Sequence, residues 1–231
     1  MNNIVESVKN RKLINPNDLD WLLENGMKEL SLIDLVKEDG LNLRYIDNQT
    51  EEICLEAVKE NWISLKYAKI QTPEICLEAV KQNGLALEYA KVQTEEICFE
   101  AVKNNSTAIE YAKIQNPEIC LRAVRNCSDN FKFIINQTPE VCLEAVKYDG
   151  LNLKYVKEQT EEICLEAIKN NPRALKYVKN QTENICKEAI KREPLLLKYV
   201  REQTYELCSF AVGLSQYAIM CVHPKFLGYK L

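Results

Sequence analysis

Apolar and polar residues follow one another along this chain in a pattern that repeats every 22 residues. Alanine, cysteine and glutamine each mark this step. The alanines are Ala57, Ala79, Ala101, Ala123, Ala145, Ala167, Ala189 and Ala211. The cysteines are Cys54, Cys76, Cys98, Cys120, Cys142, Cys164, Cys186 and Cys208, and the glutamines are Gln49, Gln71, Gln93, Gln115, Gln137, Gln159, Gln181 and Gln203. A fixed period of about 20–50 residues is typical of a solenoid, so the pattern predicts an array of tandem repeats.

The first half of each repeat is predicted to be a helix of about ten residues, with one apolar and one charged side. In one repeat the apolar positions are Ile53, Cys54, Ala57 and Val58, and the charged positions are Glu52, Glu56 and Lys59. Thr72-Pro73-Glu74 is typical of a helix start. Threonine there accepts a backbone N–H, proline suits the first turn, and glutamate favours the positive end of the helix.

The second half of each repeat is predicted to be another helix, with Leu65 on its apolar side. Asn83-Gly84 and Asn171-Pro172 mark its beginning in two repeats, because these residues end the first helix and can cap the second. Its expected length is roughly eight residues, too short for stability without neighbouring repeats.

Eight regular repeats start at the glutamines, and one degenerate repeat precedes them with Met27 and Leu32 in the glutamine and cysteine places. We predict an N-terminal helical cap over 1–26, a repeat array over 27–222 and a C-terminal closing segment over 223–231. Caps are expected because the end repeats would otherwise expose core residues. The predicted fold class is all-α, one continuous α-solenoid of tandem 22-residue helix-turn-helix repeats.

Residues 78–90 read Glu-Ala-Val-Lys-Gln-Asn-Gly-Leu-Ala-Leu-Glu-Tyr-Ala. They resemble the signature E-A-V-x-x-N-G-x-A-L-x-Y-A of a helical repeat family of unknown function, seen in tandem in giant DNA viruses and some bacteria. The resemblance covers about residues 29–222, with departures at Arg122, Phe133, Ser128 and Pro194. It implies a helical array with an interaction role, such as that of a viral or phage factor acting on a host protein. No catalytic or cofactor motif is carried over from it.

The composition indicates a soluble globular chain, because 46% hydrophobic residues are enough for a sizeable core and 28% charged residues is an ordinary share. No stretch approaches the ~18 apolar residues of a membrane span. The first residues, MNNIVESVKNRKLINPND, carry charges where a signal peptide has an apolar core. We therefore expect a cytoplasmic protein.

The cysteine column raises the question of disulfide or metal chemistry. Equivalent helices of neighbouring repeats lie about 8–10 Å apart, whereas a disulfide needs Cα atoms within ~7 Å and zinc needs sulfurs ~2.3 Å from one ion. We therefore predict buried, reduced cysteines without metal, which act as small apolar residues at helix contacts. Cys127 and Cys221 lie outside the column, and the sequence leaves open whether either is reactive.

The glutamine and glutamate columns each have two interpretations. A buried glutamine between repeats can bond the backbone on both sides and reach its equivalent in the next repeat, or the column can form a polar ladder that binds ligand. We favour the first. Glutamate pairs such as Glu52 and Glu56 recur beside lysines in repeat after repeat. This recurrence is typical of a solvated face rather than of a general acid and base.

Catalytic motifs are lacking in the sequence. His223 is the only histidine, no Cys-x-x-Cys occurs, and no glycine-rich loop precedes Lys-Ser or Lys-Thr. We predict that the protein is not an enzyme and has no catalytic, cofactor-binding or metal-binding residue.

Charge is distributed unevenly, with a net −8 over residues 1–120 and +4 over 121–231. One place in the second helix holds Glu88 and Glu110 in early repeats and lysine in later ones. The lysines are Lys132, Lys154, Lys176 and Lys198. Since they share one place in the repeat, we expect stacking to align them in a row of positive charge.

The favoured function is a non-enzymatic scaffold whose varied second-helix surface forms a concave face for a protein partner with an acidic surface. The row of four lysines, Arg173 and Trp62 are the candidate binding residues. The alternative is polyanion or nucleic-acid binding along the same lysines, against which the net charge of −4 and the pI of 5.4 weigh. Catalysis ranks last, and the sequence leaves the partner's identity and the oligomeric state open.

Overall fold

The computed structural model describes residues 29–228, in which every regular element is a helix. The predicted cap over 1–26 lies outside these residues, as do the last three residues of the predicted closing segment. The chain divides into two compact units, unit 1 up to Ile119 and unit 2 from Cys120. Each unit is an all-α solenoid of tandem repeats, which confirms the predicted fold class. The predicted segment boundaries, and one continuous array, stay predictions.

In unit 1, α-helices alternate with 3-10 helices. They are α3 (Glu29–Glu38), η1 (Gly40–Tyr45), α4 (Glu51–Glu60), η2 (Trp62–Tyr67), α5 (Pro73–Gln82), η3 (Gly84–Tyr89), α6 (Glu95–Asn104) and η4 (Ser106–Tyr111). Helix α7 (Pro117–Asn126) contains the boundary between the units.

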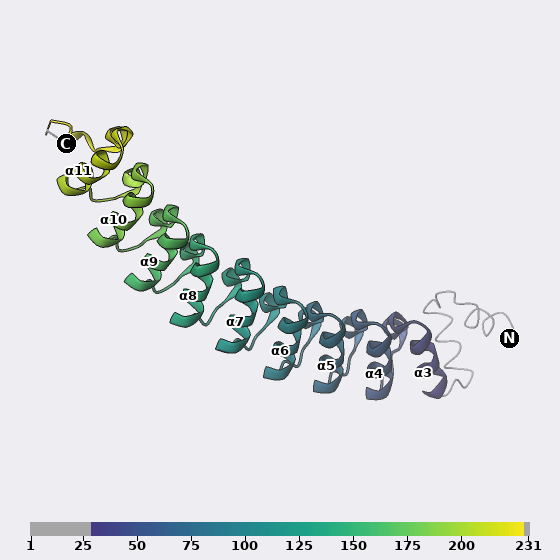
Figure 1. The fold of residues 1–231 in the computed structure, drawn as a ribbon. Helices are drawn as coiled ribbons and strands as arrows, with labels where there is room; N and C mark the ends of the chain where they lie inside the picture. The colour runs from purple at the N-terminus through teal and green to yellow at the C-terminus, as the bar shows by residue number, and fades with distance from the viewer. Residues whose placement is uncertain (1–28, 229–231) are drawn as a thin grey trace. The chain divides into compact units, whose positions relative to one another are not determined.

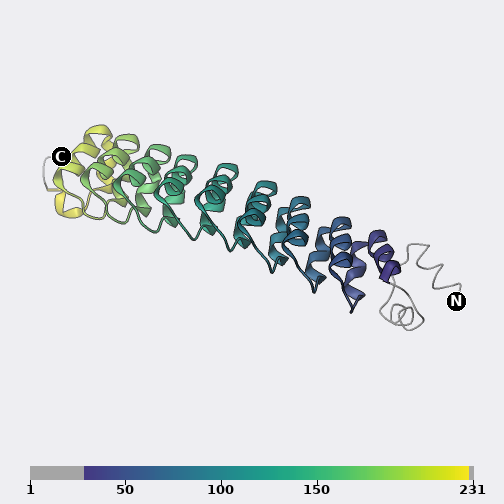
Figure 2. The ribbon, with the colours of Figure 1, turned by 90° about the horizontal axis from the view of Figure 1, so that it is seen from below.

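Unit 2 continues the same alternation. Its elements are η5 (Ser128–Phe133), α8 (Pro139–Tyr148), η6 (Gly150–Tyr155), α9 (Glu161–Asn170), η7 (Pro172–Tyr177), α10 (Glu183–Arg192), η8 (Pro194–Tyr199), α11 (Tyr205–Leu214), η9 (Gln216–Cys221) and η10 (Pro224–Phe226). Within each unit the α-helices stack side by side as one layer and the 3-10 helices as a second layer (Figures 1 and 2).

The α-helices begin where their sequences predict. Thr72 Oγ1 accepts a hydrogen bond from Ile75 N at 3.4 Å, and Pro73 occupies the first turn. Ten residues per helix agree with the expected length. The apolar side is fully buried, as Ile53, Cys54 and Ala57 show with 0% exposure. The core of each unit therefore lies between the two layers and between successive repeats.

The second helix differs from the prediction, because it is a six-residue 3-10 helix rather than an α-helix of eight residues. A single extended residue separates the two helices: Asn83 ends α5 and caps η3, accepting from Leu85 N at 3.0 Å. At about 2.0 Å per residue, six residues of 3-10 helix span ~12 Å, close to the ~15 Å of a ten-residue α-helix. Because the 3-10 helix rises further per residue, six residues are enough to come close to the length of the ten-residue α-helix beside it.

Two kinds of contact join the repeats that contain Gly84 and Gly150 to the α-helix of the next repeat. At Gly84 and Gly150 the next α-helix approaches so closely that an added Cβ would lie 2.2 Å from the carbonyl oxygen of Ala101 or Ala167. A short asparagine of the approaching helix spans each of these contacts. Asn170, for example, accepts from Gly150 N and donates to the Lys147 carbonyl, both at 2.8 Å.

Where a larger residue replaces this glycine, a longer side chain makes the bridge. After Trp62, Gln82 Nε2 donates to the Val58 carbonyl at 2.8 Å. After Pro172, the Arg192 guanidinium donates to the carbonyls of Ile168 and Lys169. In these four repeats the length of the bridging side chain follows the space that the turn residue leaves.

Candidate interaction surface

The four predicted lysines lie on successive 3-10 helices of unit 2. Lys132 is on η5, Lys154 on η6, Lys176 on η7 and Lys198 on η8, and each of these helices contacts the next. All four side chains are exposed. We call them the basic row. Their alignment in one layer follows from the constant repeat step and agrees with the arrangement expected from the sequence.

Each lysine of the basic row lies over the aromatic ring of the residue that follows it. The Nζ atoms are 4.7 Å from the Phe133 centroid, 4.6 Å from Tyr155, 4.6 Å from Tyr177 and 5.0 Å from Tyr199. An exposed cation–π contact contributes about 0.5–1 kcal/mol, enough to bias the ammonium toward one position. The basic row is therefore a series of lysine–aromatic pairs.

Unit 1 carries more positive charge at this place than the sequence argument recognised. Arg44 and Lys66 precede Glu88 and Glu110 in the same register, so they could have been found by extending the column two repeats toward the N-terminus. The Arg44 guanidinium lies 4.4 Å from the Tyr45 centroid. Glu110, and then Glu88, raise the pKa of the Tyr111 hydroxyl through their negative charge. Positive and negative side chains thus share this place in unit 1.

A second basic column, whose role was not predicted from the sequence, lies three residues further along most repeats. In five members of this column the cationic group donates a hydrogen bond to a main-chain carbonyl of the preceding repeat. They are Lys69, Lys91, Lys157, Lys179 and Arg201. Lys157 Nζ donates to the Ile135 carbonyl at 2.8 Å, and Arg201 donates to the Val178 carbonyl at 2.7 Å. We call these residues the bridging column. Their charges bind main-chain oxygens between repeats, whereas the structure gives the basic row no such main-chain partner.

The glutamine column is structural, as we favoured, although its partners differ in part from those expected. Gln159 Nε2 donates to the carbonyls of Leu153 at 3.1 Å and Tyr177 at 3.0 Å. Its Oε1 accepts from Lys179 N at 2.8 Å and from the Cys164 thiol at 3.7 Å. The glutamine thus bonds the backbone of its own repeat and of the next. A further contact with the equivalent glutamine of the next repeat is expected from the sequence, but the partners in that repeat are main-chain groups.

The other two predicted binding residues, Arg173 and Trp62, differ from the basic row, Arg173 by its ion pair and Trp62 by its partial burial. The Arg173 guanidinium forms an ion pair with Glu193 at 3.3 Å, although its side chain is exposed. Trp62 is half-buried at the start of η2 in unit 1 and does not belong to the basic row of unit 2. The structure therefore brings together the four lysines, but it does not add Trp62 to them.

The predicted burial of the cysteine column is confirmed. All eight side chains are at most 3% exposed, and all ten cysteines are free thiols. Burial raises the pKa of Cys120, Cys142, Cys164 and Cys186 to about 11. Outside the column, Cys127 is exposed and Cys221 is half-buried, with its thiol 3.6 Å from the Leu195 carbonyl. Over residues 29–228 no three His, Cys, Asp or Glu side chains are placed to hold a metal ion.

The buried thiols give stability a dependence on alkaline pH. Their pKa is about 11 when folded and about 8.5 in an unfolded chain, so the folded state favours the neutral thiol. This contribution is complete below about pH 8.5 and is lost as the pH rises toward 11. We expect replacement of Cys142, Cys164 and Cys186 by alanine to reduce the fall in Tm between pH 7.5 and 10. Tyrosine and lysine titrate in both proteins, so an equal fall in Tm would contradict the assignment to thiols.

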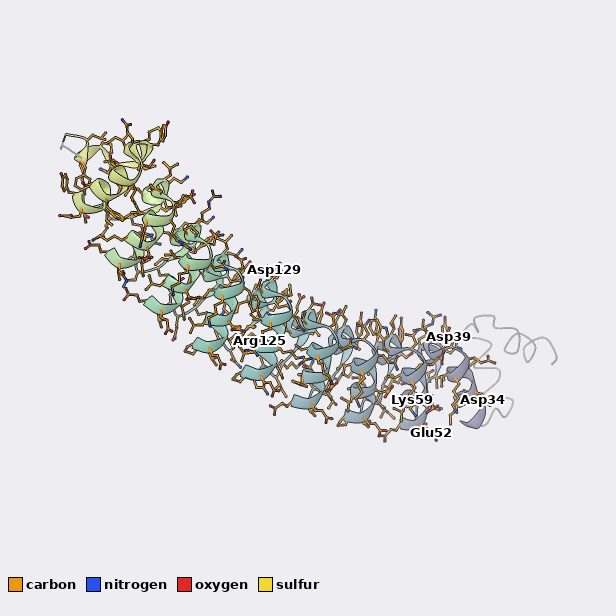
Figure 3. The ribbon with its side chains drawn as sticks, viewed as in Figure 1. Asp34, Asp39, Glu52, Lys59, Arg125 and Asp129 are labelled. Atoms are coloured by element: carbon orange, nitrogen blue, oxygen red, sulfur yellow. The ribbon has the colours of Figure 1, made fainter. Side chains whose placement is uncertain are left out.

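The glutamate pairs lie on the exposed side of the α layer, which agrees with the solvated face expected from the sequence. Glu52 and Lys59 mark this side of α4 in Figure 3. Lys59 binds Glu56 at 2.7 Å, and Lys103 binds Glu100 at 2.9 Å in the same way. Exposed pairs of this kind contribute about 0.2–1 kcal/mol.

In the part of the chain that the structure describes, no helix is long and apolar enough to cross a membrane.

Comparison with known proteins gives a family but no characterised relative. A search of curated proteins and a search of solved structures each returned no match. A family described as a domain of unknown function (DUF4116) matches residues 51–94, 72–115, 94–137, 138–182 and 160–207. Each match covers about two successive repeats and begins one or two residues after a glutamine of the column. Because these tandem matches span most of the chain, the protein belongs to the DUF4116 family.

Proposed function

We propose that this helical repeat protein is a non-enzymatic scaffold that binds a protein partner with an acidic surface through the basic row. The observation that carries the proposal is the contrast between its two basic columns. The bridging column has its charges on main-chain oxygens, so the fold itself accounts for it. The lysines of the basic row are exposed and lie over aromatic rings of the surface.

A row of like charges is mildly self-repelling, and no contact of the fold requires it. An acidic partner would offset this repulsion and accelerate association at low salt. Arg173 lies on η7, the helix that carries Lys176, and could extend the surface after exchanging Glu193 for a partner carboxylate. A host protein is the partner that the resemblance to viral repeats suggests. The cytoplasm suits the free thiols, since reducing conditions keep them unpaired.

Nucleic acid is the second candidate, because lysines beside aromatic rings also occur on surfaces that bind single strands. The net charge of −4 disfavours it, since a polyanion is repelled by the chain as a whole. A nucleic-acid partner should give a steeper salt dependence of binding and should be displaced by an oligonucleotide, whereas a protein partner should be displaced poorly.

Reversal of the basic row tests the proposal. In a variant with Lys132, Lys154, Lys176 and Lys198 replaced by Glu, we expect unchanged helical content, because these side chains are exposed. The Tm should fall modestly, because each lost cation–π contact contributes about 0.5–1 kcal/mol. The Kd for a partner captured from the source cells should rise about tenfold or more, since four exposed ion pairs contribute about 0.2–1 kcal/mol each. The salt dependence of binding should flatten. Circular dichroism and titration at two salt concentrations measure these effects.

The matched control reverses four exposed charges of the α layer at another repeated place. These are Arg125, Lys147, Lys169 and Lys191. Arg125 is labelled in Figure 3, on α7. The control changes the net charge by the same amount but leaves the basic row intact. Equal losses of affinity in both variants would show that net charge alone attracts the partner, and the proposal would be wrong.

A further inference from the structure

We propose that the basic row recognises an extended acidic peptide segment in which an acidic side chain recurs at every third residue. This inference rests on the proposed function and adds the form and the spacing of the partner. It is carried by the identity of each lysine–aromatic pair, by the distance between successive repeats, and by the point at which the row ends.

Each of the three tyrosine-containing pairs offers two donor groups, an ammonium and a phenol hydroxyl, to one carboxylate. Lys154 lies over the Tyr155 ring, and the hydrogen bond with the Tyr155 hydroxyl is the main cause that raises the pKa of the Lys154 ammonium. An ammonium has three donors, so this bond leaves others for a ligand. The phenol proton is a further donor at the same place. A carboxylate therefore finds a charge and a hydroxyl side by side.

Lys176 and Lys198 likewise lie over the rings of Tyr177 and Tyr199, each of which carries a hydroxyl. Phe133 lacks the hydroxyl, so the first pair offers only the ammonium of Lys132. The charge of Asp149 also raises the pKa of Lys154, and the Asp149 carboxylate caps η6 by accepting from Leu151 N at 2.9 Å. The tyrosine-containing pairs are expected to contribute most to binding.

The spacing of the repeats determines the spacing of the ligand. Packed helices lie about 8–10 Å apart, so successive lysines of the row are separated by about that distance. An extended chain rises about 3.3 Å per residue, and a polyproline II helix about 3.1 Å. Three residues therefore cover roughly 9–10 Å, whereas two cover too little and four too much. A polyproline II helix also has three residues per turn, which places every third side chain on one side.

The density of charge favours a peptide over a nucleic acid. Double-stranded DNA carries one charge per about 1.7 Å of its axis, far more than one lysine per repeat can neutralise. A peptide with one acidic residue in three matches the basic row one to one. The match ends at η9, where Met220 takes the lysine place and is 75% exposed. Four acidic residues should therefore fill the row, and a fifth should add little affinity.

The test uses synthetic peptides of four Glu-Pro-Pro units, with fluorescein at one end and the full chain as receptor. Matched peptides hold the four glutamates at spacings of two and of four, with equal length and charge. We expect the spacing of three to bind about tenfold more tightly than either, because only it satisfies all four exposed pairs. Fluorescence anisotropy at low salt measures the three Kd values.

Two variants and one competitor complete the experiment. Replacing Lys132, Lys154, Lys176 and Lys198 by Gln should abolish the preference for a spacing of three. Replacing Tyr155, Tyr177 and Tyr199 by Phe should weaken binding severalfold while the rings and the fold are retained. A phosphate-rich competitor, oligo-thymidylate with four phosphates, should displace the peptide poorly.

The outcomes separate this inference from the proposed function. Equal affinity at all three spacings, still dependent on the four lysines, would overturn the spacing and leave an acidic partner intact. Tight binding of the oligonucleotide in place of every peptide would overturn both. Absence of binding by any peptide would overturn this inference, while the charge-reversal experiment with the captured partner still decides the proposed function.

Discussion

Replacing Gln159 by Ala should lower the free energy of unfolding by about 2–4 kcal/mol, because the side chain is the partner of two main-chain groups in the next repeat. The Tyr177 carbonyl would lose its donor and Lys179 N its acceptor. The Leu153 carbonyl would keep its bond from Val156 N at 3.2 Å. Urea denaturation followed by circular dichroism measures the loss.

Gln216 provides the matched control. It is an exposed glutamine at the start of η9, so Gln216→Ala should change the free energy of unfolding by less than about 0.5 kcal/mol. Gln159→Glu tests the role of the amide, because a carboxylate accepts from Lys179 N but cannot donate to the two carbonyls. It should therefore destabilise the protein despite its equal size. Similar stability of the Ala, Glu and parent proteins would show that water replaces these bonds.

Replacing Gly150 by Ala should cost about 1–3 kcal/mol, because the new Cβ would lie 2.2 Å from the Ala167 carbonyl oxygen and 3.0 Å from Asn171 N. Both contacts are with backbone, so α9 would have to move away from η6. That movement would lengthen the bonds that join Asn170 to Gly150 N and to the Lys147 carbonyl. Thermal and urea denaturation give the size of the loss.

Gly213→Ala is the control, and its effect should have the opposite sign. Gly213 lies within α11 with no atom within 4 Å of an added Cβ. Alanine is more favourable than glycine in a helix by about 1 kcal/mol, so this variant should be more stable than the parent protein. If both substitutions stabilise the protein, the close approach at Gly150 is not a constraint on the fold.

Local sequence was sufficient to predict the first helix of each repeat. Its start depends on a threonine cap and its buried side on apolar residues at helical spacing, and both are short-range properties of the chain. The second helix could not be predicted as well. Its 3-10 form depends on fitting six residues between an extended cap at Asn83 and the turn to the next repeat. That constraint involves the height of the neighbouring layer.

The candidate surface was predicted only in part, because it too depends on contacts between neighbouring repeats. The basic row and the bridging column are both columns of basic residues at a 22-residue step, and the sequence by itself does not tell them apart. Only the fold shows that Lys157 and Lys179 reach carbonyls of the preceding repeat. Lys154 and Lys176 instead lie over their neighbouring rings on the exposed surface.

By itself, the sequence determined the repeat, its register, its helix starts and its buried columns. The repeat and its register follow from residues that recur at the same place every 22 residues, and the helix starts and buried columns follow from local residue patterns within each repeat. The tertiary structure alone decided which glycines admit a neighbouring helix, which side chains bridge two repeats, and which lysines lie over aromatic rings on the exposed surface. These features depend on distances between residues about one repeat apart along the chain, and stacking brings such residues together.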